Sequence, residues 1–242
     1  MQLIHIYERT PERALFIAAH PDDIEFVAAG TAAKWAAAGA DVRYVLVTRG
    51  DAGSHDLTAT RERIAEVRMA EQRAAAQVTG VQEVLFLAHP DGAVEPTLNL
   101  RRELVREIRR FRPEVMVCFD PTQVFIRDDY VNHPDHRAVG QAALDAACPA
   151  AAMPLIFADL KHEGLAPHRV KEILVATGYQ PNCWVDISAT LEVKLRALRC
   201  HGSQFASGWD PAPLVRNWAT EAGSLAGLSH AESFRRIVWP RP

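Results

Sequence analysis

The sequence predicts an α/β fold: an open, mainly parallel β-sheet with helices on both faces. Short apolar runs alternate with longer Ala-rich or amphipathic segments along residues 13–147, which is the pattern of strand and helix units joined by right-handed crossovers. A polar loop follows each apolar run. These loops should therefore gather at the carboxyl edge of the sheet, where open α/β folds place their ligand sites.

The first two units are clear. An apolar run at 13–19 predicts a strand buried on both faces. The Ala-rich residues 25–38 predict a helix that Gly39 would cap. A second apolar run predicts a strand at 42–48, and apolar residues on one face predict a long helix at 60–78.

The third and fourth units repeat the pattern. A strand is expected at 83–87, followed by an amphipathic helix at 100–111 whose charged residues face water. Another strand is expected at 115–119. The long loop 120–132 then leads into a helix at about 134–147, where a proline suits the first turn.

The second half of the chain is less regular. Strands are predicted at 171–177 and 183–187, and a helix at 189–200. The Gly- and Pro-containing remainder predicts loops and short helices, with a final strand at 236–239. The length suits a single domain over residues 1–242.

The composition limits the class of protein. The chain is 48% hydrophobic and 24% charged with a net charge of -3, which is typical of an ordinary soluble globular domain. Without a basic stripe, nucleic acid is not an expected partner. No apolar run is long enough to cross a bilayer and the first residues lack the pattern of a signal peptide, so no membrane association and a cytoplasmic location are expected.

Two polar clusters, far apart in sequence, predict a metal site. His20, Asp22 and Asp23 follow the first predicted strand, and His133 and His136 follow the fourth. Two imidazoles and one carboxylate form an open zinc site that leaves a position for water and lowers its pKa to about 7. A further carboxylate can act as general base. One His-Pro-Asp stretch alone could be a local helix cap, but two such clusters at one sheet edge favour a function.

These clusters resemble those of the zinc-dependent de-N-acetylases of the PIG-L or LmbE-like family, which have a Rossmann-like three-layer fold. The resemblance covers most of the chain. Further matching positions are 47–53, Arg68 with Glu71, Asp91 with Gly92, 184–187, and Lys194 with 201–204.

The resemblance implies roles for the residues of the two clusters. His20, Asp23 and His136 would bind zinc. Asp22 would take a proton from the metal-activated water and later give it to the leaving amine. His133 would stabilise the tetrahedral intermediate, as donors aimed at a developing oxyanion do.

The resemblance also implies a substrate class. The acetyl group would be removed from an N-acetylglucosamine-type sugar or conjugate, a small molecule. Arg68 and Asp91 would contact its hydroxyls, and His201 would also bind it. The loops 120–132 and 206–224 would set the preference for the rest of the substrate. Family members often form homo-oligomers, so a homo-oligomer is compatible with the resemblance.

The residues themselves leave alternatives open. Asp22 and Asp23 could exchange roles, and either His133 or His136 could be the ligand, with Asp135 orienting a ligand or stabilising the helix start.

Three rival functions also remain. One is an amidase of a bulkier thiol-sugar conjugate. Another is an Fe(II) oxygenase, because His20 and Asp22 with a distant histidine also form a facial triad. The last is a non-catalytic Rossmann-like binding module, although the Gly-rich turn that it needs is replaced by the His20 cluster.

Overall fold

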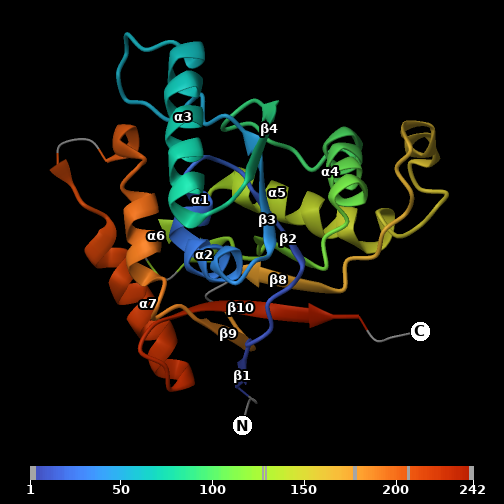
Figure 1. Ribbon diagram of the computed structural model, residues 1–242. Coiled ribbons are helices and arrows are strands. Elements are labelled where there is room, and N and C mark those ends of the chain that lie inside the picture. The colour runs from blue at the N-terminus through green and yellow to red at the C-terminus, as the bar shows by residue number, and fades with distance from the viewer. Residues whose placement is uncertain (1–3, 127, 129, 177–178, 206–207, 240–242) are drawn as a thin grey trace.

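The fold is organised around one eight-stranded sheet with helices on both faces (Figure 1). The computed structural model describes all residues except 1–3, 127, 129, 177–178, 206–207 and 240–242. The strand order is β1-β9-β10-β8-β5-β2-β3-β4. The predicted α/β class, with three layers and a mainly parallel sheet, is confirmed. This architecture disfavours the Fe(II) oxygenase alternative, because facial-triad oxygenases usually have an all-β barrel.

The order of the strands creates a site at the middle of the sheet. From β2 the chain continues to β3 and β4 on one side, and then crosses to β5 and β8 on the other side. β2 pairs in parallel with both β3 and β5, so the order reverses between β2 and β5. Such a switch point is where α/β sheets bind ligands.

The sheet strands are β1 (His5–Ile6), β2 (Arg13–Ala18), β3 (Asp41–Thr48), β4 (Glu83–His89), β5 (Val115–Phe119), β8 (Glu172–Ala176), β9 (Cys183–Asp186) and β10 (Ala231–Val238), and β6 (Phe125–Ile126) and β7 (Tyr130–Val131) form a separate hairpin.

Each face of the sheet has its own hydrophobic core. In β2, Ala14 and Phe16 point into one core, and Leu15 and Ile17 point into the other, as the alternation of side chains along a strand requires. The first core is covered by α1 (Asp23–Val27), α2 (Ala29–Ala37), α3 (Arg61–Thr79), α6 (Leu191–Leu198) and α7 (Ala212–Ala226), and the second by α4 (Leu98–Phe111) and α5 (Pro134–Asp145). The described residues also form three short helices: η1 (Ala146–Ala150), η2 (Ala158–Glu163) and η3 (Gly202–Gln204).

The first predicted helix, 25–38, is divided into α1 and α2. The break is at Ala28, whose φ of -148° is not helical. The side chain of Glu232 accepts hydrogen bonds from the N–H groups of Gly30 (2.9 Å) and Thr31 (2.7 Å). Lys194 lies 2.5 Å from the same carboxylate and balances its charge. A buried acid from β10 therefore caps the second helix, which local composition could not indicate.

The second half differs most from the prediction. Residues 206–224 were expected to be a loop, but most of this stretch belongs to α7; Ala206 and Ser207 lie outside the described residues. The final strand is longer than 236–239 and runs antiparallel to both of its neighbours. Thr177, the expected end of a strand, is outside the described residues. The loop 120–132 contains the hairpin of β6 and β7.

Candidate active site

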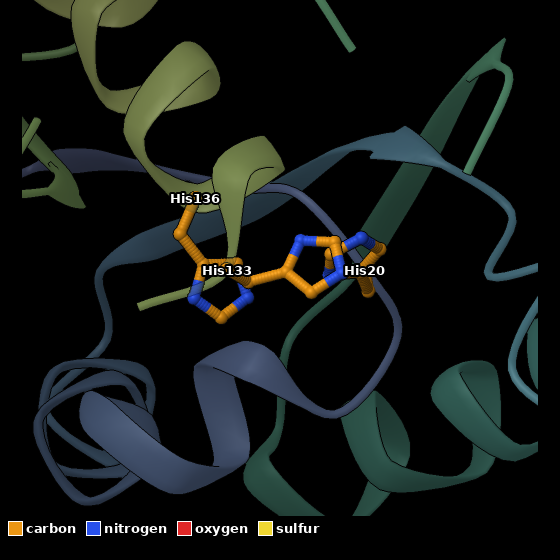
Figure 2. A group of neighbouring side chains, drawn as sticks. All are labelled: His20, His133 and His136. Carbon is orange, nitrogen blue, oxygen red and sulfur yellow. The ribbon is translucent and has the colours of Figure 1, made fainter. Parts of the chain in front are cut away.

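The two predicted clusters meet at the switch point of the sheet. His20, Asp22 and Asp23 occupy the turn between β2 and α1, and His133 is the N-cap of α5, which begins beyond β5. Figure 2 shows the imidazoles of His20, His133 and His136 gathered in one place. Their ring centroids are 4.7 Å apart for His20 and His133, and 5.3 Å apart for each of the other two pairs.

The short turn fixes the carboxylate of Asp23. Its Oδ2 accepts hydrogen bonds from the backbone N–H groups of Ala19 (3.0 Å) and His20 (2.7 Å). Its Oδ1 lies 2.9 Å from Nε2 of His136. Burial opposes ionisation, but the neighbouring His136 and His20 hold the pKa of Asp23 well below its usual range. Asp23 is thus an ionised carboxylate that points at the second cluster and can offer an oxygen atom to a metal.

His20 is surrounded by carboxylates. Its Nε2 lies 3.0 Å from Oδ1 of Asp91 and 3.1 Å from Oδ2 of Asp135. Ionised carboxylates only accept hydrogen bonds, so the Nε2 nitrogen carries a proton and Nδ1, 3.5 Å from Oδ2 of Asp23, faces the first cluster. Burial opposes protonation, but Asp23 and the hydrogen bonds to Asp135 and Asp91 raise the pKa of His20 to about 12. The excess of buried negative charge favours a bound cation.

A second histidine is oriented by an amide. Nδ1 of His136 lies 3.2 Å from Oδ1 of Asn132, and the amide is held in this orientation because its Nδ2 donates to the Gln123 carbonyl at 2.8 Å. Nδ1 is therefore the donor to Asn132, and the other nitrogen, Nε2, faces Oδ1 of Asp23. The ring is also stacked on Phe119, with centroids 4.4 Å apart and planes 8° apart.

His133 has the opposite tautomer. Its Nδ1 accepts a hydrogen bond from the backbone N–H of Asp135 at 3.2 Å. A neutral ring then carries its proton on Nε2. Burial, together with the nearby His20 and His136, lowers the pKa of His133, which favours this neutral form. His133 is thus arranged to donate a hydrogen bond from Nε2.

Distances alone allow two groups of metal ligands among the described residues. They are His20 with His133 and His136, and His20 with Asp91, His133 and Asp135, each with ligand atoms within 4.8 Å of one another. The hydrogen bonds discriminate further. Asp23 belongs to neither group, but its Oδ2 lies 3.5 Å from Nδ1 of His20 and its Oδ1 lies 2.9 Å from Nε2 of His136, whereas Nδ1 of His133 is occupied by the N–H of Asp135. Two nitrogens and one carboxylate oxygen suit zinc.

Asp22 is placed differently from its neighbour Asp23. Its Oδ2 lies 3.2 Å from Nη2 of Arg68, and its side chain is 15% exposed. Burial raises the pKa of Asp22 to about 6, although the positive charge of Arg68 opposes this shift. The carboxyl group therefore remains near the surface of the site and can exchange a proton close to neutral pH.

The residues expected to contact the substrate are largely covered. Arg68 is 4% exposed and donates to the carbonyls of Gly50 (3.0 Å) and Pro21 (2.7 Å). Asp91 is 6% exposed and binds His20; direct contacts of these two with a substrate stay predictions. His201 is fully buried, so direct contact with a substrate is incompatible with this conformation.

Sequence reasoning missed two residues that support the site. Asn132 orients His136, and Gln72 accepts a hydrogen bond from the backbone N–H of Asp22 at 3.0 Å. Asn132 could have been suspected because it directly precedes the second cluster. Gln72 gave no signal, since a glutamine on a long polar helix is ordinary.

A family model described as GlcNAc-PI de-N-acetylase, PIG-L, matches residues 15–147, a stretch that includes both clusters. The chain belongs to the PIG-L family. The suspected resemblance is therefore confirmed. Dependence on a metal is a property of PIG-L deacetylases, and the His and Asp groups described above are able to bind one.

The relatives of this PIG-L family member are deacetylases. Diacetylchitobiose deacetylase of Thermococcus kodakarensis is 34% identical over 230 residues, which cover 93% of this chain and 83% of that protein. Probable N-acetyl-alpha-D-glucosaminyl L-malate deacetylase 2 of Bacillus anthracis is 26% identical over 82% of this chain and 84% of its own. The expectation of an enzyme that hydrolyses amides is thereby confirmed.

One solved structure of a deacetylase is also similar to this chain. N,N'-diacetylchitobiose deacetylase from Pyrococcus horikoshii, complexed with its inhibitor MPG, has a TM-score of 0.86 and 29% identity, and the match covers 94% of this PIG-L chain and 84% of that one.

Among the described residues, no helix is both long and apolar enough to cross a membrane.

Proposed function

We propose that this protein is a zinc-dependent hydrolase that removes the acetyl group from the 2-amino group of an N-acetylglucosamine-type sugar or conjugate. The relatives named above, which act by their names on diacetylchitobiose and on an N-acetylglucosaminyl malate, support this substrate class. They differ in what is attached to the sugar. An amide hydrolase that prefers a bulkier thiol-sugar conjugate is therefore the alternative that a substrate panel must test.

The observation that carries the proposal is the pattern of hydrogen bonds around the ligands. Partners occupy Nε2 of His20, Oδ2 of Asp23 and Nδ1 of His136. Each side chain therefore keeps one further ligand atom, and the Asp23 carboxylate lies 3.5 Å from Nδ1 of His20 and 2.9 Å from Nε2 of His136. We assign His20, Asp23 and His136 as zinc ligands on this basis. Zinc bound there would act as a Lewis acid that polarises the amide carbonyl and lowers the pKa of water to about 7.

Proton transfer is assigned to Asp22. Its carboxylate is next to the proposed ligands but is held by Arg68 instead. In the proposed reaction, Asp22 takes the proton from the attacking water and passes it to the amine nitrogen as the C–N bond breaks. The two steps balance, because the base returns to its ionised form when the free amine leaves.

His133 is assigned to the developing oxyanion. The backbone N–H of Asp135 occupies its Nδ1, so a proton on Nε2 is available to the carbonyl oxygen as charge builds there. Arg68 and Asp91 are proposed to hold Asp22 and His20 and to reach sugar hydroxyls only with their small exposed edges.

Two substitutions test the proposal. Asp22→Asn should keep the metal and lose about 10²- to 10⁴-fold in turnover, because only the base is removed. His136→Ala should lose the metal. The exposed Asp56 and His162 provide matched controls as Asp56→Asn and His162→Ala, which should retain both properties.

The assay measures metal content by atomic absorption and the release of free amine from N-acetylglucosamine, diacetylchitobiose, an N-acetylglucosaminyl malate and a thiol-sugar conjugate. If Asp22→Asn hydrolyses these amides at the parent rate, Asp22 is not the base. If only the thiol-sugar conjugate is cleaved, the alternative substrate class is correct.

A further inference from the structure

The peptide bond that precedes Asp22 is held at both of its polar groups by one helix. Nη2 of Arg68 donates to the carbonyl oxygen of Pro21 at 2.7 Å, and the N–H of Asp22 donates to Oε1 of Gln72 at 3.0 Å. Residues four apart lie one above the other on the same face of a helix. Arg68 and Gln72 of α3 can therefore bracket a single peptide group.

This attachment coincides with a strained backbone. Asp22 has a φ of 92° and a ψ of -26°, in a region that residues other than glycine rarely adopt. Such conformations persist only where the surrounding structure holds them, and they are concentrated at functional sites. The position of the Asp22 carboxylate thus depends on groups that hold its backbone.

Gln72 is itself fixed by a buried chain of polar groups. Its Nε2 donates to Oε1 of Glu25 at 3.0 Å, and Oε2 of Glu25 lies 3.3 Å from Nε2 of His201. All three residues are fully buried. Because Glu25 accepts from the amide nitrogen, the amide cannot flip, and its oxygen remains directed at Asp22.

The far end of this chain of groups is also anchored to α3. Ser203, two residues after His201, donates from its backbone N–H and from its hydroxyl to Glu71, at 2.7 Å each. Glu71 directly precedes Gln72. The segment that begins at His201 is therefore fastened to the same helix turn that holds Asp22.

We propose that Gln72, Glu25 and His201 are positioning residues that fix the backbone, and hence the carboxylate, of Asp22. This inference rests on the proposed role of Asp22 as the base. His201, which is too deeply buried to contact a substrate, thereby has a role in the reaction. Gln72 and Glu25 have one too, although their described side-chain hydrogen bonds do not reach a proposed metal ligand.

The first test is Gln72→Met, which keeps the length of the side chain and removes both amide hydrogen bonds. A displacement of the base by about 1 Å can cost about 10²-fold in rate, so kcat should fall by about 10- to 100-fold with KM and metal content close to those of the parent. Gln77→Met is the matched control, because Gln77 is exposed on the same helix, and it should behave as the parent.

The second test exchanges the two partners. Gln72→Glu alone places two carboxylates against each other and should lower kcat as the methionine variant does. The double variant Gln72→Glu/Glu25→Gln restores an acceptor for the Asp22 N–H and a donor between the two side chains, so most of kcat should return. Thermal melting of each variant verifies that it is folded.

The outcomes separate the two proposals. If Asp22→Asn is inactive but Gln72→Met retains the parent kcat, the positioning role is wrong and the base assignment stands. A loss in Gln72→Glu that the double variant does not restore, with metal content and stability falling together, also overturns positioning. If Asp22→Asn is fully active, the base assignment fails and the positioning role fails with it.

Discussion

Replacing Asn132 by leucine should weaken metal binding without touching a proposed ligand. Asn132 is 4% exposed and lies with its Oδ1 3.2 Å from Nδ1 of His136. Leucine has a similar shape but offers no acceptor. The imidazole of His136 would then lose the hydrogen bond that fixes its tautomer and orientation, and with it part of its basicity as a ligand.

The magnitude follows from two separate losses. Removing the partner of a ligating histidine typically costs about 10- to 100-fold in metal affinity, or about 1.4–2.7 kcal/mol. The metal-free protein also loses the bonds of Asn132 to His136 and to the Gln123 carbonyl. At about 1 kcal/mol each, these lower the free energy of unfolding by about 2 kcal/mol, and the melting temperature by about 4–8 °C.

Competition with a fluorescent zinc chelator would measure the affinity, and calorimetry of the chelator-treated protein would measure the melting temperature. Asn132→Asp keeps an acceptor and should bind metal at least as tightly as the parent. Asn217→Leu, at an exposed position of α7, is the control for a surface leucine. Parent-like zinc affinity in Asn132→Leu would refute the assignment of Nε2 of His136 as a metal ligand oriented through Asn132.

Three further predictions concern stability. Arg109 is 2% exposed and donates to five backbone carbonyls of the segment after α5. Arg109→Met should therefore lower the free energy of unfolding, measured in urea, by about 3–5 kcal/mol. Arg110→Met, at an exposed position of the same helix, should change it little. Gly140→Ala should cost about 1–3 kcal/mol in the same assay, because a Cβ there would lie 2.6 Å from the carbonyl oxygen of Phe119; an unchanged midpoint would show that this contact relaxes freely. Burial lowers the pKa of His168 despite its hydrogen bond to a backbone carbonyl. The unfolded chain therefore binds the proton more readily than the folded one. As pH rises through the folded pKa and then the unfolded pKa, this group makes the folded protein more stable. His168→Gln should therefore gain less stability than the parent as pH rises toward the ordinary histidine pKa of about 6.5, and parallel pH curves would contradict this.

The sequence by itself determined the central part of the fold and the members of the site. β5, and β2 after Arg13, are apolar because both of their faces are buried, so their position can be predicted without knowing what covers them. The two His-Pro-Asp clusters follow such strands directly. Since parallel strands bring their carboxyl ends to one edge, the meeting of His20 with His136 could be predicted from local pattern and topology.

The tertiary structure decided what local pattern cannot encode. Asp22 and Asp23 are adjacent and chemically identical, and they differ only because one faces Arg68 and the other His136. Glu232, which lies near the other end of the chain, caps α2 and so marks where the predicted first helix is divided.

The physical reason is range. The type of an element depends on the period of its own residues, whereas the protonated atom of a ring, the free oxygen of a carboxylate and the strained turn at Asp22 depend on hydrogen-bond partners that only the folded chain brings near. Gln72 is 50 residues from the N–H that it accepts, and nothing in its own surroundings in the sequence marks it for that contact.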